Sequence, residues 1–231
     1  MSKSKLILAL DLPSPQVAFQ LLGGIPSITQ VKIGPGLFMQ EGPSLITELH
    51  AKGYKVFLDL KHHDIPNTVR LAVREAKEMG VWMLSVHCSG GVKMLQAAVE
   101  EAAGNPLLLG ITVLTSLDDP QLREIGFPGP VEAQVEKLAS LGQKAGLQGI
   151  VASPHEVRKL RACLGRDTLI ITPGIRIEAG AKHDQSRTMT PREAVEAGAD
   201  YLVIGRPILE ASHPKEAVAS ILASLETAPK P

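Results

Sequence analysis

Short apolar runs that alternate with helix-like stretches are the feature that most constrains the fold of this chain. Each run is rich in β-branched and aliphatic residues, is bounded by turn residues, and is followed by a segment whose apolar positions have helical spacing. We interpret eight runs as strands, over residues 5–11, 28–33, 55–61, 83–88, 107–114, 149–153, 169–173 and 201–205. Eight strand and helix units in 231 residues predict an α/β fold, a closed (β/α)8 TIM barrel that forms one domain over residues 1–231.

Proline and glycine residues mark the expected ends of several helices. Helices are expected to begin at Pro15, Pro66, Pro154 and Pro191 and to end near Gly53, Gly80 and Gly165. A doubly wound open sheet is the competing fold, and it usually carries a glycine-rich turn after its first strand. Here the first strand ends in Asp11-Leu12-Pro13, and the sequence has neither a GxGxxG motif nor a P-loop. The barrel is therefore favoured.

The composition narrows the range of partners and compartments. Lysine and arginine together number 24, as do aspartate and glutamate, so no overall field attracts nucleic acid or an anionic membrane. Cys88 and Cys163 are the only cysteines, and their positions fit neither a disulfide framework nor a zinc site. No apolar stretch approaches the roughly 20 residues that cross a bilayer. We expect a cytoplasmic protein without nucleic-acid or membrane partners.

Charged residues stand at the end of the third predicted strand. The two-residue period of a strand places Phe57, Asp59 and Lys61 on one face. Helices cover the outside of a barrel, where an unpaired charge would be costly, so we expect this face to point into the barrel. Active sites of barrels form at the carboxyl ends of the strands. Asp59 and Lys61 are therefore candidate catalytic residues.

Similar reasoning selects Asp11 and Lys32 at the ends of the first two strands, and Asp64 on the loop after the third. Asp11, Lys32, Asp59 and Lys61 alternate in sign along the chain. A structural layer of salt bridges is the alternative for Asp59 and Lys61, and a solvated position on the rim is the alternative for Asp11 and Lys32.

Histidines near these charges give weaker signals. His62, His63 and Asp64 suggest a metal site, but adjacent side chains of an extended chain point apart and no further ligand follows at metal spacing. We therefore expect no metal. His87 ends the fourth strand, where a packed core histidine is favoured over a residue of the site.

Candidate phosphate-binding residues follow the last two strands. Loops after strands seven and eight frequently hold phosphate in barrels, through backbone N–H groups and arginine. Gly205 and Arg206 follow strand eight, and Arg176 follows strand seven. The long loop from Gly174 to Met189 adds the donors Lys182, Gln185 and Arg187. An ordinary surface turn and a loop without a ligand are the alternatives.

The segment Asp59-Leu60-Lys61-His62-His63-Asp64-Ile65-Pro66-Asn67-Thr68 resembles the signature of the orotidine 5′-monophosphate decarboxylase family, in its bacterial form. Further segments that match are Leu8-Ala9-Leu10-Asp11, Val31-Lys32-Ile33-Gly34, Val86-His87 with Ser89-Gly90-Gly91, Val113-Leu114-Thr115-Ser116, Thr172-Pro173-Gly174-Ile175-Arg176 and Ile204-Gly205-Arg206-Pro207. The resemblance spans nearly the whole chain. It implies an enzyme that converts orotidine 5′-monophosphate to uridine 5′-monophosphate and CO2 without a cofactor.

The resemblance also implies roles for individual residues. Lys61 would protonate C6 of the pyrimidine, and Asp59 would lie beside the substrate carboxylate. Lys32 and Asp11 would contact the ribose. The resemblance further implies that Asp64 and Thr68 complete the site of the neighbouring subunit in a homodimer, that Thr115 borders the base, and that Arg176, Gln185, Gly205 and Arg206 hold the phosphate and pyrimidine.

Two other functions stay open on the sequence. Related barrels that decarboxylate or condense sugar phosphates share the Asp-x-Lys-x-x-Asp run but use magnesium, and the Ile65-Pro66-Asn67-Thr68 continuation argues against them. A barrel that binds the nucleotide without turning it over is the third hypothesis.

Overall fold

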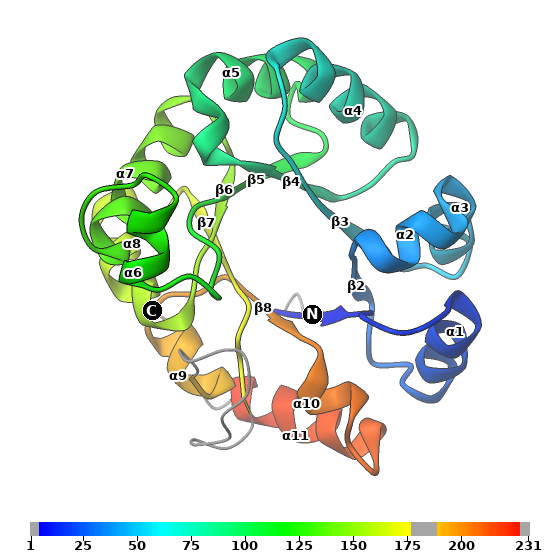
Figure 1. Cartoon of the computed structure of the whole chain (residues 1–231). Helices are drawn as coiled ribbons and strands as arrows, with labels where there is room; N and C mark the ends of the chain where they lie inside the picture. Colours follow the sequence, from blue (N-terminus) through cyan, green and yellow to red (C-terminus); the bar gives the residue numbers. More distant parts are fainter. Residues whose placement is uncertain (1–4, 177–188, 227–231) are drawn as a thin grey trace.

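Eight parallel strands close into a barrel in chain order, with β8 paired to β1 (Figure 1). The structure is a computed structural model that describes residues 5–176 and 189–226. The strands are β1 (Leu6–Ala9), β2 (Gln30–Ile33), β3 (Lys55–His62), β4 (Met83–His87), β5 (Leu107–Ile111), β6 (Gly149–Val151), β7 (Leu169–Thr172) and β8 (Tyr201–Ile204). The predicted barrel and its eight strands are confirmed. Seven of the eight strands are shorter than predicted, and six of them end one to three residues earlier than the apolar runs suggest.

Helices surround the barrel (Figure 1). They are α1 (Pro15–Gly24), α2 (Pro35–Glu41), α3 (Pro43–Ala51), α4 (Pro66–Glu78), α5 (Gly91–Ala102), α6 (Asp119–Glu124), α7 (Val131–Lys144), α8 (Val157–Leu164), α9 (Pro191–Glu196), α10 (Arg206–Leu209) and α11 (Pro214–Glu226), with 3-10 turns η1 (Cys88–Gly90) and η2 (Pro154–Glu156). Among the described residues, no helix has the length and apolar character required to span a membrane.

The predicted helix starts at Pro15, Pro66 and Pro191 are confirmed. The α-helical start at Pro154 is wrong, because Pro154 opens η2 and α8 begins only at Val157. A 3-10 turn commonly leads into an α-helix, and here the Glu156 carboxylate accepts a hydrogen bond from the backbone N–H of Ser153 at 2.9 Å.

Two hydrophobic layers follow from the alternation of side chains along the strands. The inner layer fills the barrel with Ile7, Ala9, Phe57, Met83, Leu109, Ile171 and Val203. The outer layer lies between strands and helices and includes Val56 and Leu58. Phe57 and its neighbours Val56 and Leu58 thus belong to different layers, which confirms the predicted inward face of β3.

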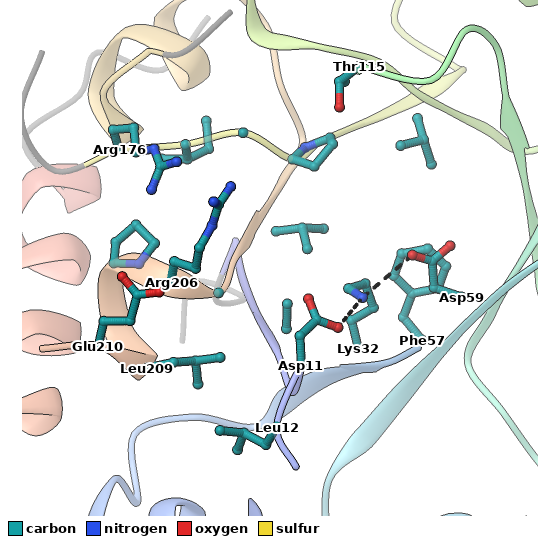
Figure 2. A pocket seen from close by; sticks show the side chains of 18 of the residues that line it. Asp11, Leu12, Lys32, Phe57, Asp59, Thr115, Arg176, Arg206, Leu209 and Glu210 are labelled. Carbon is teal, nitrogen blue, oxygen red and sulfur yellow. Dashed lines mark hydrogen bonds and ion pairs between the residues drawn. The ribbon is translucent and has the colours of Figure 1, made fainter. Parts of the chain in front are cut away.

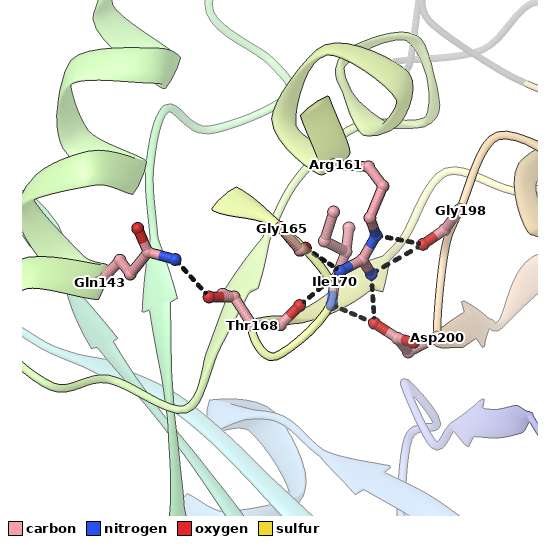
Figure 3. Close-up of polar contacts among 7 residues, drawn as sticks. All are labelled: Gln143, Arg161, Gly165, Thr168, Ile170, Gly198 and Asp200. Carbon is pink, nitrogen blue, oxygen red and sulfur yellow. Dashed lines mark hydrogen bonds and ion pairs between the residues drawn. The ribbon is translucent and has the colours of Figure 1, made fainter. Parts of the chain in front are cut away.

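Arg161 of α8 joins the amino-terminal ends of β7 and β8 (Figure 3). Its guanidinium forms an ion pair with Asp200 at 2.6 Å and donates to the carbonyl oxygens of Thr168 and Gly198, each at 2.8 Å. Its side chain is 18% exposed. Because a planar guanidinium can make several directed hydrogen bonds at once, one side chain satisfies backbone groups of two strand-entry loops.

We predict that Arg161→Ala lowers the free energy of unfolding by about 2–3 kcal/mol, because it leaves partly buried acceptors without a donor. Arg161→Lys should recover only part of this loss, since a lysine ammonium cannot make the set of directed hydrogen bonds that the planar guanidinium makes. Arg74→Ala is the control, because Arg74 also makes two hydrogen bonds to a carboxylate, that of Glu101, but on the exposed surface. Urea unfolding measures all three variants, and equal losses for Arg161→Ala and Arg74→Ala would contradict the prediction.

Candidate active site

A pocket of about 670 Å³ opens at the carboxyl ends of the strands (Figure 2). Its walls come from residues at or just after the ends of the strands, as expected for a barrel enzyme. The sequence-predicted residues that line it are Asp11, Lys32, Asp59, Lys61, Thr115, Arg176, Gly205 and Arg206. Phe57, Leu12 and Glu210 also line it and were not predicted as site residues. The structure therefore brings most of the predicted site together.

Four charged side chains of alternating sign form one connected network. Lys32 Nζ lies 3.0 Å from Asp11 Oδ1 and 3.6 Å from Asp59 Oδ2, and Lys61 Nζ lies 2.8 Å from the same Asp59 oxygen. The Asp59 and Lys32 side chains are only 9% and 11% exposed. Burial of these charges is tolerable because each is paired with an opposite charge.

Gly34 leaves room for this network. A Cβ atom at position 34 would lie 3.3 Å from Asp11 Oδ1 and 3.4 Å from Lys32 Nζ. Any larger residue would therefore press on the Asp11–Lys32 ion pair. The need for a glycine directly after β2 is a matter of space, since its backbone φ of −92° is open to any residue.

The environment of Asp59 acts on its pKa in two opposing ways. Burial by itself raises the pKa of Asp59, but the charges of Lys32 and Lys61, together with hydrogen bonds from Lys61 and Ser85, leave it below its usual value. The carboxylate is therefore ionised at neutral pH. An ionised Asp59 between two cations gives the pocket a fixed pattern of charge before a ligand binds.

Lys61 reaches the pocket from an irregular part of β3. The pairing of β3 with β4 shifts between Leu58 and His62, and Lys61 has a left-handed backbone with φ of +52°. The backbone N–H of Lys61 donates to Ser85 Oγ at 2.8 Å, and this hydroxyl donates to Asp59 Oδ1 at 2.8 Å. Sequence reasoning missed Ser85, whose only signal is a polar side chain at an inward position of β4.

Two arginines occupy the side of the pocket opposite Asp59 (Figure 2). Arg176 is 7% exposed, and its Nε and Nη2 atoms are buried without a hydrogen-bond partner among the described residues. Arg206 begins α10 directly after Gly205, whose added Cβ would lie 3.3 Å from Ala9 Cβ. The two Arg176 donors, which have no acceptor in the part of the chain that the structure describes, favour an anionic ligand at this end.

Two of the predicted site residues lie away from this pocket. Asp64 and Thr68 are exposed and do not line the pocket of their own chain, and Asp64 Oδ1 accepts a hydrogen bond from the N–H of Ile65 at 2.6 Å. Gln185, like the neighbouring Lys182 and Arg187, lies outside the described residues.

None of the described histidines lines the pocket. The His87 ring lies 5.4 Å from that of His63, and burial, followed by the proximity of His63 and Lys61, lowers the pKa of His87. In residues 5–176 and 189–226, no cluster of three or more histidine, cysteine, aspartate or glutamate side chains is arranged to hold a metal ion.

We predict that Lys61→Ala raises the pKa of Asp59, because the carboxylate keeps its burial but loses one cation and one hydrogen bond. A depressed folded-state pKa stabilises the fold above the pKa of the unfolded chain, and this stability disappears as the pH falls through the folded-state value. Acid unfolding of the variant should therefore begin at a higher pH. Carbon-13 NMR titration measures the pKa. Lys52→Ala, at the residue directly after α3, is the control, and an unmoved Asp59 pKa in Lys61→Ala would refute the assignment.

Comparison with known proteins places the chain among decarboxylases. A model of the orotidine 5′-phosphate decarboxylase / HUMPS family matches residues 4–221. Orotidine 5′-phosphate decarboxylases of Pasteurella multocida and Nitrosococcus oceani are 48% and 47% identical over 227 and 229 residues, which is 96% and 97% of this chain and 97% and 99% of theirs. A crystal structure of the enzyme from Lactobacillus acidophilus superposes with a TM-score of 0.87 at 36% identity, over 96% of this chain and 99% of that one. The chain therefore belongs to the orotidine 5′-phosphate decarboxylase / HUMPS family.

Proposed function

We propose that this enzyme decarboxylates orotidine 5′-monophosphate to uridine 5′-monophosphate and CO2, as the last step of de novo UMP synthesis in the cytoplasm. The observation that carries the proposal is the network of Asp59, Lys32 and Lys61 on one side of a pocket whose other side presents Arg176 and Arg206. The names of its relatives support the same reaction.

The proposed reaction needs a positive charge that is already positioned near C6 and a group that donates a proton to C6. It does not need a cofactor that accepts the electron pair. The bond between C6 and the carboxylate carbon breaks, CO2 leaves, and the electron pair stays on C6. The Lys61 ammonium stabilises this developing charge and then transfers a proton to C6. Asp59, beside the substrate carboxylate, repels it in the ground state, and this repulsion falls as CO2 departs. Lys61 regains its proton from water.

The arginine side of the pocket would hold the phosphate. Arg176 has two buried donors that lack an acceptor among the described residues and would bind an anion, and Gly205, which has no side chain, would let the backbone approach this anion. Lys32 and Asp11 would bind the ribose hydroxyls, and Thr115 would border the base. Gln185 would act from its loop on the phosphate and pyrimidine. Binding energy gained at the phosphate, far from C6, would hold the reacting carbon against Lys61.

Sugar-phosphate barrels of the same family are the alternative, since the family model covers both branches. Their reactions use magnesium and an enediolate. The contacts of Asp59 favour decarboxylation without a metal, because one of its oxygens already accepts from Ser85 and the other lies beside two ammonium groups. We therefore propose a reaction that needs no cofactor.

The predicted assay follows the absorbance of orotidine 5′-monophosphate. Wild type should turn it over equally with and without EDTA, and Lys61→Ala should retain less than about 1% of kcat because it lacks both the fixed charge and the acid. Binding of uridine 5′-monophosphate is the control for an intact pocket. Loss of wild-type activity in EDTA would favour the magnesium-dependent enzymes. Binding of the nucleotide without turnover by wild type would favour a binding protein. Unchanged turnover by Lys61→Ala would remove Lys61 from the mechanism.

We further propose that the enzyme is a homodimer in which Asp64 and Thr68 complete the neighbouring site. Both residues lie outside their own pocket, on the segment that links β3 to α4 and begins that helix. Ile65 on this segment is 66% exposed, and Met39 of α2 is 83% exposed. Ile65, which directly follows Asp64, and Met39 are exposed large hydrophobic residues, and such residues are suited to contact with a second copy of the chain.

Complementation tests this arrangement. Lys61→Ala and Asp64→Ala should each be nearly inactive alone. If Asp64 acts in the other subunit, mixed dimers regain one intact site, so an equal mixture after subunit exchange should recover about a quarter of wild-type activity. A mixture as inactive as its components would show that Asp64 acts within its own chain.

A further inference from the structure

Ser85 is a buried hydroxyl that the proposed chemistry does not use. It lies on the inward face of β4, is 0% exposed, and does not line the pocket. Its Oγ donates to Asp59 Oδ1 and accepts from the Lys61 backbone N–H, both at 2.8 Å. A serine hydroxyl has a single proton to donate, and Ser85 donates this proton to Asp59 while it accepts a hydrogen bond from the Lys61 N–H.

The first contact fixes the orientation of the Asp59 carboxylate. Rotation about the terminal torsion of an aspartate is soft, so one bonded oxygen alone would leave the other free to move. Here Oδ1 is held by Ser85 and Oδ2 by Lys61 at 2.8 Å, with Lys32 at 3.6 Å. Without Ser85 the carboxylate could turn and change the position of the Lys61 ammonium.

The second contact supports an unfavourable backbone. A left-handed conformation is unfavourable for a residue with a Cβ atom, and Lys61 adopts it with φ of +52°. The shifted pairing of β3 and β4 accompanies this conformation, and the Ser85 hydroxyl accepts the hydrogen bond of the Lys61 N–H where a ladder carbonyl would do so in a regular strand. Strained backbone of this kind persists only where neighbouring groups hold it.

We infer that Ser85 is a positioning residue, which aims the Lys61 ammonium and the Asp59 carboxylate at the reacting carbon through one shared hydroxyl. The inference rests on the proposed function, because it assigns the hydroxyl to proton delivery by Lys61. Ser85 acts at a distance from the substrate, so its loss should affect the chemical step and spare nucleotide binding.

The experiment compares Ser85→Ala, Ser85→Cys and the control Thr168→Val. Thr168 is also a buried hydroxyl, but it accepts from Gln143 at 2.8 Å at the opposite end of the barrel. Ser85→Ala should lower kcat by at least about tenfold, with the Kd of uridine 5′-monophosphate within about twofold of wild type. Ser85→Cys, which keeps a weak donor, should fall between Ser85→Ala and wild type, and Thr168→Val should keep wild-type kcat.

A second measurement is independent of the reaction. The Lys61 amide should exchange with solvent roughly tenfold faster in Ser85→Ala than in wild type, as followed by NMR, because its buried acceptor is gone. Wild-type kcat in Ser85→Ala, or a loss of uridine 5′-monophosphate affinity equal to the loss of kcat, would overturn the inference while leaving the proposed decarboxylation intact. A wild-type enzyme without decarboxylase activity would overturn both, and the exchange rate would then report only whether Ser85 holds the backbone.

Discussion

The Asp59 carboxylate, held between two ammonium groups and one hydroxyl, is the constraint on which the pocket depends. Its partners come from neighbouring strands: Lys32 from β2, Lys61 from β3 itself and Ser85 from β4. Only an arrangement that places the carboxyl ends of these strands side by side brings the groups within 2.8–3.6 Å. The order of the strands in the barrel therefore sets which charges meet.

In the proposed reaction, one side of the pocket would bind the phosphate and the other would carry the chemistry. Arg176 and Arg206 give one side a positive charge that suits a phosphate, whereas the network around Asp59 balances its charges internally. A neutral but strongly polar network can stabilise charge that develops during a reaction without reorganising first. Because Asp59 and Lys32 are largely buried, water screens the interaction between their charges less than it would at the surface.

The sequence predicts the barrel and most of the residues of the pocket, but it does not predict the backbone conformation at Lys61 or the contact of Ser85. Alternating apolar runs and proline starts predict the barrel, and strand periodicity turns Asp59 and Lys61 inward. Lys61 nevertheless arrives there through a left-handed residue in a shifted strand pairing, which a two-residue period cannot reveal. The sequence does not predict a role for Ser85, because a single small polar residue in a buried strand cannot be distinguished from a residue that only packs in the core. The proposed roles of Asp64 and Thr68 would depend on a second chain, about which spacing along one chain says nothing.

The central claim is that the charges stand in their working positions before any ligand binds. Crystal structures of the enzyme alone and with uridine 5′-monophosphate test it most directly. The account predicts that Lys32 Nζ, Lys61 Nζ and the Asp59 carboxylate differ by less than about 0.5 Å between the two structures, as a preorganised site requires. A Lys61 ammonium that points away from the pocket in the free enzyme and enters it only with the nucleotide would contradict the account.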